Sequence, residues 1–311
     1  MSLERALELA EAARGRAYPK PTVGAVVVGG GEVVGEGVTE ADGRHGEVVA
    51  LEAAGQRARG ATLYVTMEPC AHRGTTPPCV DAVVAAGIAR VVAATLDPNR
   101  EAGGGLERLR EQGVEVELAE NFEARRQNEA WRTWIAEGRP FVIYKAAVTL
   151  DGRVTVPDER WVSGEGSRRL VHELRAASDA VAVGMGTVRL ENPRLDARDV
   201  DAMRQPRRLA FGTGPLPEGS ELELRAGPLE EELRALAAEG VQSLLLEGGP
   251  TLASAFLRAG LVDKLLRFVA PKLSGSGPGI ADRLDEPLRL SRLTSRAVDD
   301  DVLLEAYLHE P

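Results

Sequence analysis

Cysteine and lysine are both scarce in this sequence. Only two cysteines, Cys70 and Cys79, occur among 311 residues, so a disulfide-stapled scaffold is excluded and the pair points to a single site. Four lysines stand against 34 arginines, no basic run is present, and the net charge is −10. These features argue against nucleic acid or an anionic membrane surface as the main partner. A small anionic substrate remains compatible, because local arginine clusters can bind phosphate on an acidic protein.

Long apolar runs are also missing. The longest uncharged apolar stretches are far shorter than a membrane-spanning helix, and the N-terminal residues have no apolar core of a signal peptide. Hydrophobic residues still make up 43% of the chain, which is enough to build real cores. We therefore expect a soluble, cytoplasmic protein, and the length predicts two domains of similar size.

The first half alternates helical and strand patterns. Helices are predicted over residues 3–15, 45–55, 80–86 and 105–112, and strands over 23–28, 32–36, 62–66, 90–94 and 114–118. Gly29 to Gly31 predict a hairpin turn and not a phosphate loop, because another strand follows them. This order predicts an α/β/α layered domain with a mostly buried sheet.

A charged, helical stretch over residues 120–137 leads to Gly138, Arg139 and Pro140, which form the best boundary on composition. We therefore divide the chain into domains 1–139 and 140–311. Strands in the second domain are predicted over residues 141–145, 180–183 and 242–247 and near 302–308. The second domain is accordingly also of the α/β class.

The strongest local signal is His45 and Glu47 at a helix start, followed by Cys70 and Cys79, each directly after a proline. A neutral imidazole and two thiolates suit Zn²⁺, and three protein ligands leave the fourth tetrahedral position for water. Glu47, two residues from His45, is well placed to move a proton between that water and a leaving ammonia. The alternative is a surface histidine with two cysteines that act as small buried hydrophobes.

His45, Glu47, Cys70 and Cys79 resemble the signature of the zinc nucleoside and nucleobase deaminases, although the eight residues between the cysteines depart from the general pattern. The longer segment 66–79, together with Asp97-Pro98-Asn99, resembles the deaminase half of the bifunctional riboflavin-biosynthesis deaminase/reductase family. The resemblance implies a cytidine-deaminase-like α/β/α fold. It also implies that His45, Cys70 and Cys79 hold Zn²⁺, that Glu47 is the catalytic acid/base, and that His72 and Asn99 line the substrate pocket.

Four positions of this half depart from the family pattern. Lys20, Thr39, Gly46 and Thr75 stand where the family usually has Asn, His, Ala and a basic residue. Because the metal ligands and Glu47 are kept, we expect deamination to persist. A positive charge for the substrate phosphate would then come from Lys20, Arg44 or Arg73.

In the second half, a predicted strand over residues 242–247 runs into Gly248, Gly249 and Pro250 and then a helix. Glycines free the backbone amides and the proline starts the helix, so a phosphate could bind at its N-terminus. A plain helix cap with a glycine-rich turn is the alternative.

Motifs spread from residue 139 to 308 resemble the reductase half of the same family, and their order and spacing carry the likeness. The resemblance implies a dihydrofolate-reductase-like α/β domain that binds NADPH and reduces the substrate ribose to a ribityl chain. It assigns the cofactor to Trp161, Thr187, Glu191, Thr213, Gly249, Pro250, Thr251, Leu252, Ala253, Ser254 and Ala255. It assigns the substrate to Lys145, Arg175, Leu195, Arg198 and Glu247. Glu191 and Glu159 stand where the family usually has Asp and Ser.

The resemblance thus implies a bifunctional enzyme with Zn²⁺ and NADPH as cofactors and a phosphorylated pyrimidine as its small-molecule substrate. It further implies a homo-oligomer formed through the reductase domain, with no nucleic acid or membrane partner. Two alternatives remain: a deaminase of another base or nucleotide with a degenerate reductase half, and a non-catalytic nucleotide sensor with structural zinc. A structural zinc site would be closed by a fourth protein ligand.

Overall fold

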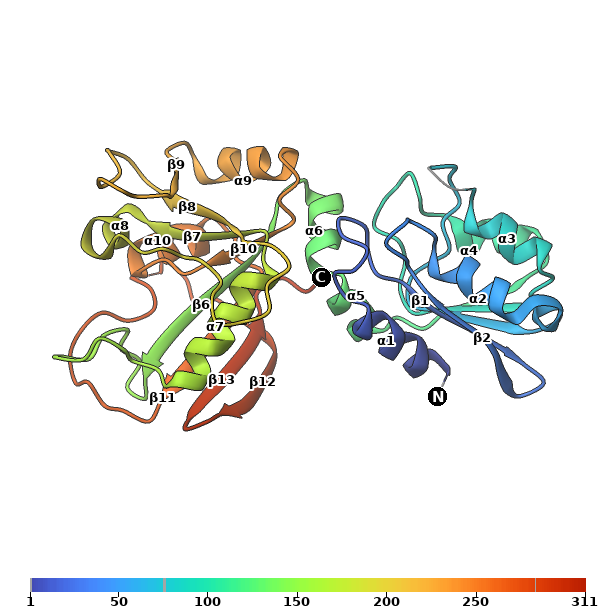
Figure 1. The fold of residues 1–311 in the computed structure, drawn as a ribbon, viewed down its shortest axis with the longest axis horizontal. Coiled ribbons are helices and arrows are strands. Elements are labelled where there is room, and N and C mark those ends of the chain that lie inside the picture. The colour runs from blue at the N-terminus through green and yellow to red at the C-terminus, as the bar shows by residue number, and fades with distance from the viewer. Residues whose placement is uncertain (1, 75–76, 283) are drawn as a thin grey trace. The chain divides into compact units, whose positions relative to one another are not determined.

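The computed structural model describes residues 2–74, 77–282 and 284–311 (Figure 1). The chain divides into two compact units: one ends at Glu137 and the other runs from Gly138 to Glu310. The sequence prediction sets the boundary two residues later, after Arg139. Within the described ranges, no helix is long and apolar enough to cross a membrane.

The first unit is built on a five-stranded sheet with the order β2-β1-β3-β4-β5. Its strands are β1 (Gly24–Gly29), β2 (Glu32–Val38), β3 (Thr62–Val65), β4 (Arg90–Ala93) and β5 (Glu115–Leu118). β1 pairs antiparallel with β2 and β3, whereas β3, β4 and β5 are parallel. The predicted hairpin turn is confirmed: Gly30 and Gly31 have φ angles of 59° and 86°, which a two-residue turn of this kind requires.

Helices cover both faces of this sheet (Figure 1). They are α1 (Ser2–Ala12), α2 (Gly46–Ala54), α3 (Cys79–Ala85), α4 (Gly105–Glu111), α5 (Phe122–Gln127) and α6 (Glu129–Glu137), with a 3-10 turn at Gly55–Ala58. A Cβ at Gly24 would lie 2.0 Å from the Ala6 oxygen of α1, and one at Gly35 would lie 2.2 Å from the Ala50 oxygen of α2. These glycines let α1 and α2 approach opposite faces of the sheet closely.

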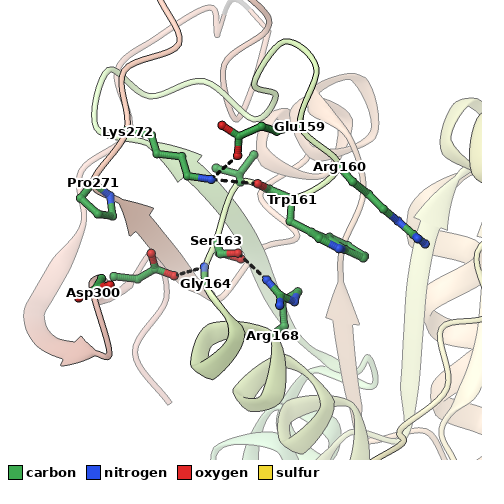
Figure 2. Close-up of a pocket in the computed structure, with 11 residues that line it drawn as sticks. Glu159, Arg160, Trp161, Ser163, Gly164, Arg168, Pro271, Lys272 and Asp300 are labelled. Carbon is green, nitrogen blue, oxygen red and sulfur yellow. Dashed lines mark hydrogen bonds and ion pairs between the residues drawn. The ribbon is translucent and has the colours of Figure 1, made fainter.

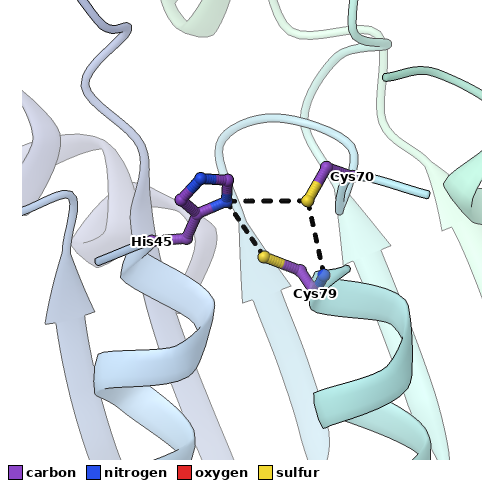
Figure 3. Close-up of side chains that lie close together, drawn as sticks. All are labelled: His45, Cys70 and Cys79. Carbon is purple, nitrogen blue, oxygen red and sulfur yellow. Dashed lines mark hydrogen bonds between the residues drawn. The ribbon is translucent and has the colours of Figure 1, made fainter. Parts of the chain in front are cut away.

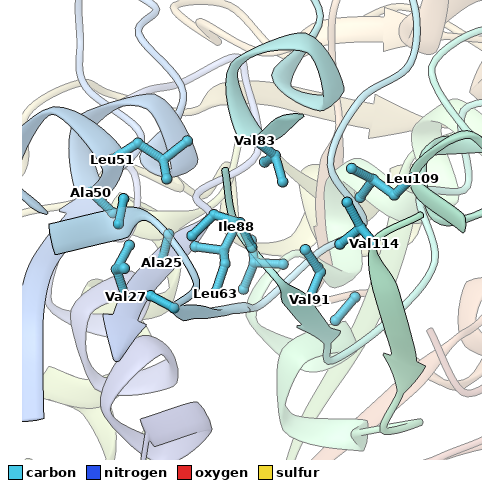
Figure 4. Packing of buried hydrophobic residues seen from close by; sticks show 14 of the residues in the cluster. Ala25, Val27, Ala50, Leu51, Leu63, Val83, Ile88, Val91, Leu109 and Val114 are labelled. Atoms are coloured by element: carbon cyan, nitrogen blue, oxygen red, sulfur yellow. The ribbon is translucent and has the colours of Figure 1, made fainter. Parts of the chain in front are cut away.

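The core of the first unit lies on the α2 face (Figure 4). Ala25, Val27 and Leu63 are fully buried there, with Leu51 of α2 and Val83 of α3 packed over them. The alternating pattern of the strands is what sends these side chains to one face. The predicted α/β/α layering is confirmed, and this packing fixes the N-termini of α2 and α3 beside each other.

The second unit is built on an eight-stranded sheet with the order β12-β13-β11-β6-β10-β7-β8-β9. Its strands are β6 (Phe141–Thr149), β7 (Ala180–Gly184), β8 (Arg207–Phe211), β9 (Glu223–Arg225), β10 (Ser243–Leu246), β11 (Lys264–Ala270), β12 (Ser291–Val298) and β13 (Asp301–Tyr307). All pairs from β11 through β9 are parallel, and β13 and β12 add antiparallel strands at one end. The parallel centre aligns the carboxyl ends of six strands along one edge.

The helices of this unit are α7 (Glu165–Ala177), α8 (Met185–Glu191), α9 (Leu229–Ala238) and α10 (Pro250–Arg258). Leu233 of α9 and Phe256 of α10 share one apolar cluster with Val142 of β6. Val188 of α8 packs in a second cluster with Val181 of β7. Helices therefore cover both faces of this sheet as well, in agreement with the predicted α/β class.

Candidate functional sites

His45 and Glu47 lie at the start of α2. His45 is the residue that caps this helix, with extended backbone angles, and Glu47 lies in its first turn. The Glu47 side chain is almost completely buried, with an exposed fraction of 3%. Burial raises the pKa of Glu47 to about 7. A carboxyl group with such a pKa can take up and release a proton near neutral pH.

The two cysteines face His45 (Figure 3). Cys79 is the first residue of α3, and Cys70 lies in the loop that follows β3. His45 Nδ1 is 3.1 Å from Cys79 Sγ and 3.6 Å from Cys70 Sγ. Hydrogen bonds from the Cys79 side chain, from His45 and from the Cys79 amide lower the pKa of the Cys70 thiol to about 4, against the effect of burial.

This donor set fits a zinc ion. The three ligand atoms lie within 4.8 Å of one another. Tetrahedral bonds of about 2.3 Å to sulfur and about 2.0 Å to nitrogen set ligand atoms about 3.6–3.8 Å apart. The contact between the two thiols lowers the pKa of Cys70 and raises that of Cys79, so Cys70 is the first of the pair to become the thiolate that binds metal. Among the residues that the structure describes, this is the one cluster of its kind.

Glu68 braces the Cys70 loop, and the sequence analysis missed it. Its side chain is 5% exposed. Glu68 Oε1 accepts a hydrogen bond of 3.0 Å from the Leu106 amide in α4, and Oε2 accepts one of 3.2 Å from the Asp97 amide. A charged residue two positions before a proposed ligand was the available signal, because a buried carboxylate needs such partners. Burial also raises the pKa of Asp97 to about 6.

His72 and Asn99 are half-buried in neighbouring loops. His72 Nδ1 is buried and has no hydrogen-bond partner among the described residues. Asn99 Oδ1 accepts a hydrogen bond from the Glu101 amide, so this side chain shapes its own turn. His72 therefore has a free ring nitrogen for a ligand, whereas Asn99 is partly used within its loop.

Three of the altered positions behave differently from one another, and Thr75 lies outside the described residues. Thr39 is buried and its hydroxyl accepts from the Val23 amide, so it supports β1 and not a pocket wall. Lys20 is exposed, and a Cβ at Gly43 would lie 2.6 Å from its Nζ. The hydrogen bond with Cys70 raises the pKa of His45, and the positive charge of Lys20 opposes this shift, so Lys20 lies near His45. Gly46 packs against the backbone of the sheet at Val23.

In the second unit, three predicted substrate residues meet in one ionic cluster. Arg175 Nε is 2.6 Å from Glu247 Oε1, and Lys145 Nζ is 3.3 Å from Glu247 Oε2. Burial alone would raise the pKa of Glu247, but the charges of Lys145 and Arg175 outweigh it and lower the pKa to about 2. The cluster of two cations and one anion keeps a net positive charge.

Arg198 lies beside this cluster. It donates to Asp196 Oδ1 at 2.7 Å, and Arg175 donates to the Asp196 carbonyl at 3.2 Å. The structure thus brings the two predicted phosphate-binding arginines to one short segment. Leu195 of the same segment is 3% exposed and packs in the core, so its side chain does not face solvent.

The glycine-rich turn after β10 begins α10 as predicted, with Gly249 as cap and Pro250 in the first turn. Thr187 lies beside it: a Cβ at Gly249 would be 3.8 Å from Thr187 Oγ1. Thr213 is exposed after β8, and Glu191 is exposed at the end of α8. The other predicted cofactor residues of α10 divide into the partly or fully exposed Thr251, Leu252 and Ala255 and the fully buried Ala253 and Ser254.

Trp161 lines a cavity of about 400 Å³ (Figure 2). Trp161 is 48% exposed, and the guanidinium groups of Arg160 and Arg168 lie 4.9 Å and 5.5 Å from the centre of its ring. Lys272 donates to the Trp161 carbonyl and pairs with Glu159 at 2.5 Å. Glu159, which departs from the family pattern, therefore anchors this loop to the end of β11.

Comparisons with known proteins cover both units. Residues 1–95 match the family model of the cytidine and deoxycytidylate deaminase zinc-binding region, and residues 140–304 match that of the RibD C-terminal domain. The riboflavin biosynthesis protein RibD of Aquifex aeolicus is 37% identical, with 97% of this chain and 96% of that protein aligned. The RibD of Mycobacterium tuberculosis is 45% identical, with 88% of this chain and 85% of that protein aligned.

Two solved structures agree with the fold over nearly the whole chain. Acinetobacter baumannii RibD superimposes with a TM-score of 0.86 at 33% identity, covering 98% of this chain and 97% of that one. The Thermotoga maritima diaminohydroxyphosphoribosylaminopyrimidine deaminase/5-amino-6-(5-phosphoribosylamino)uracil reductase gives a TM-score of 0.83 at 33% identity, with the same coverage. The chain therefore belongs to the RibD family of bifunctional riboflavin-biosynthesis enzymes, which join a zinc-binding deaminase domain to an NADPH-dependent reductase domain.

Proposed function

We propose that the first unit hydrolytically deaminates 2,5-diamino-6-(5-phosphoribosylamino)pyrimidin-4-one. The second unit then reduces the ribose of 5-amino-6-(5-phosphoribosylamino)uracil to the ribityl form with NADPH. The observation that carries this proposal is the convergence of His45 Nδ1, Cys70 Sγ and Cys79 Sγ within 4.8 Å, beside the buried Glu47. The Thermotoga maritima relative is named for both activities, which supports the choice of substrates.

In the deaminase unit, His45, Cys70 and Cys79 hold the metal and Glu47 moves the proton. Zinc, when bound, supplies a Lewis acid that activates water near neutral pH. Glu47 takes a proton from the attacking water at its carboxylate and returns it to the leaving amine, so that ammonia departs. The pKa of about 7 suits both directions of this transfer. Three protein ligands in the described cluster, instead of four, favour this role over a structural zinc site.

In the reductase unit, the substrate binds at the Lys145, Arg175 and Glu247 cluster, with Arg198 beside it. Two cations against one buried anion leave positive charge for a phosphate. The guanidinium forks of Arg175 and Arg198 suit its oxygens. NADPH binds over the start of α10, where the amides of Thr251 and Leu252 follow Pro250 in the first helical turn. The hydride comes from the cofactor, so these residues act by positioning and electrostatics.

The test is a Glu47→Gln variant of the full chain. We expect it to keep one zinc per chain and to lose ammonia release, because the amide cannot carry the proton. NADPH oxidation on the deaminated substrate should match the parent. Glu52→Gln is the matched control: Glu52 lies on the same helix, is exposed and pairs with Arg44. Loss of zinc from the Glu47 variant, or undiminished ammonia release, would contradict the assignment.

We also propose self-association through the reductase unit, in a reducing, cytoplasmic compartment. The edge strand β12 is mostly exposed, and its Leu293 is 68% exposed. Cys70 and Cys79 form no disulfide although their sulfur atoms lie close together, which supports the compartment. Light scattering should give a mass above one chain for the parent and a lower mass for Leu293→Asp. A single-chain mass for the parent would contradict the association.

A further inference from the structure

Three segments meet at the carboxyl edge of the parallel strands in the second unit. β10, β7 and β8 are neighbours in this order, and glycines stand at that end of each strand: Gly248 and Gly249 after β10, Gly184 as the last residue of β7, and Gly212 directly after β8. A Cβ at Gly212 would lie 3.0 Å from Met185 Cγ of α8. The loop after β8 thus packs on the start of α8, which in turn lies against the start of α10. Ligands of open α/β sheets bind at this edge.

Arg189 of α8 reaches from this helix to the loop after β8. Its Nη2 donates to the Thr213 carbonyl at 2.6 Å. A Cβ at Gly214 would lie 2.8 Å from the same nitrogen, and Gly214 has a φ of 97°, so a glycine leaves room for the guanidinium group there. Arg189 is itself exposed. Its fork is therefore held at the rim of the edge while most of its donors face solvent.

The charge of Arg189 is not neutralised by a neighbour. In the described part of the chain, no carboxylate oxygen lies within 4 Å of its guanidinium nitrogens. The arginines on the adjoining strands differ, because each of them pairs with glutamate: Arg207 with Glu223 and Glu239, Arg208 with Glu221, and Arg225 with Glu223, Glu232 and Glu239. Arg189 thus carries a positive charge at this edge that no described carboxylate matches.

We propose that Arg189 binds the 2′-phosphate of NADPH and so selects NADPH over NADH. This rests on the cofactor site proposed above, with the pyrophosphate at the start of α10. β10 and β8 are separated by one strand, hence by about 10 Å. If the pyrophosphate binds beside Thr187, the adenosine half of the cofactor extends past the end of β7 toward β8. The 2′ position of its ribose then lies near Thr213 and Arg189. An arginine near the ribose is a known means of accommodating the 2′-phosphate in other dinucleotide-binding sheets.

The recognition is chemically specific. A guanidinium group can donate two parallel hydrogen bonds to a phosphate dianion, and NADH has only a hydroxyl at that position. Loss of the contact should therefore weaken the binding of NADPH and leave the binding of NADH unchanged. For the loss of one charge-assisted contact we expect the dissociation constant of NADPH to rise about ten- to hundredfold.

The experiment measures equilibrium binding of NADPH, NADH and adenosine 2′,5′-bisphosphate to the full chain by calorimetry. Arg189→Ala should weaken the binding of NADPH and of the bisphosphate about ten- to hundredfold. Its affinity for NADH should equal that of the parent. Arg189→Lys should keep part of the affinity, since it retains the charge without the fork. Arg234→Ala is the matched control, because Arg234 is an exposed arginine of the same unit that pairs only with Glu230 on its own helix.

Three outcomes distinguish this inference from the cofactor site itself. Equal weakening of NADPH and NADH by Arg189→Ala would contradict recognition of the 2′-phosphate and leave the cofactor site standing. Unchanged NADPH affinity would contradict any role for Arg189. A parent that binds neither dinucleotide would contradict the cofactor site and the inference together.

Discussion

The glycine at position 46 separates the proposed ligand His45 from Glu47, where the family usually has alanine. A Cβ at Gly46 would lie 2.3 Å from the Val23 oxygen and 3.2 Å from the Val38 Cα. Both contacts are with backbone at β1 and β2, which cannot turn away as a side chain can. The start of α2 is therefore closer to the sheet here than an alanine permits.

We expect Gly46→Ala to destabilise the first unit by about 1–3 kcal/mol and to lower ammonia release, because the helix start must move with His45 and Glu47. Chemical unfolding, zinc content and deaminase rate measure this. Gly186→Ala is the control, since nothing lies within 4 Å of its added Cβ. A Gly46→Ala protein with the stability and rate of the parent would show that α2 adjusts freely.

Positive charge near the proposed metal ligands is the second residue-scale feature. Arg44 pairs with Glu40, Asp42 and Glu52, so its charge is already matched. Lys20 is exposed, and its charge acts on the pKa of His45. Arg73 is exposed in the loop between the two cysteines.

We expect Lys20→Ala or Arg73→Ala to weaken apparent affinity for the phosphorylated substrate about ten- to hundredfold. The dephosphorylated analogue should be unaffected, and Arg44→Ala should match the parent on both compounds. Steady-state kinetics on the two compounds provides the measurement. If both variants match the parent in apparent affinity for the phosphorylated substrate, neither Lys20 nor Arg73 supplies the positive charge for the phosphate.

Among the elements, α10 is where the cofactor proposal depends most on one residue. Gly249 begins the helix with a φ of −64° and a ψ of 174°, and its nearest neighbour for an added Cβ is 3.8 Å away. The fold thus tolerates a larger residue there, whereas a phosphate approaching the backbone does not.

We therefore expect Gly249→Val to lower NADPH affinity while leaving thermal unfolding of the second unit unchanged. Titration of NADPH and a thermal scan of the same protein separate the two effects. Unchanged affinity for NADPH in a folded Gly249→Val protein would contradict binding of the cofactor at the start of α10.

Local sequence patterns predicted the elements whose signals are local. Gly30 and Gly31 indicate the turn between β1 and β2, and Pro250 indicates the start of α10. The helical stretch predicted over residues 120–137 is instead two helices that meet at Asn128, whose side chain accepts from the Thr22 amide and donates to the Thr22 carbonyl. A contact across more than a hundred residues leaves no periodic signal in the stretch that it interrupts.

Some strands and contacts were not predictable for a related reason. β12 is mostly exposed, so the alternation that reveals a half-buried strand is absent from it. The metal site was predictable from His45, Cys70 and Cys79 because this combination of residue types is typical of zinc ligands. Glu68, which braces the Cys70 loop, is an ordinary acidic residue in the sequence until the fold buries it.

At the scale of the whole molecule, the position of the division matters for stability. Arg139 donates two hydrogen bonds of 2.7 Å to Asp263, and both side chains are buried. Asp263 also accepts from the Val142 amide at the start of β6. Arg139 is therefore part of the second unit, one residue before the predicted domain start.

We expect a fragment of residues 138–311 to fold by itself, and a fragment of residues 141–311 to be less stable. Removing Arg139 leaves the buried Asp263 carboxylate without its cation, which costs about 3–5 kcal/mol. Circular dichroism and urea unfolding of both fragments measure the difference. An unfolded 138–311 fragment would contradict the independence of the units, and equal stabilities would contradict the role of Arg139.

The most direct test of the two-step function follows ammonia and NADPH in one reaction. The parent enzyme, loaded with zinc, receives 2,5-diamino-6-(5-phosphoribosylamino)pyrimidin-4-one and NADPH. We predict that ammonia appears first and that an equal amount of NADPH is then oxidised, with the ribityl compound as product. No ammonia from this substrate, or ammonia release without any NADPH oxidation, would contradict the assignment of both steps to this chain.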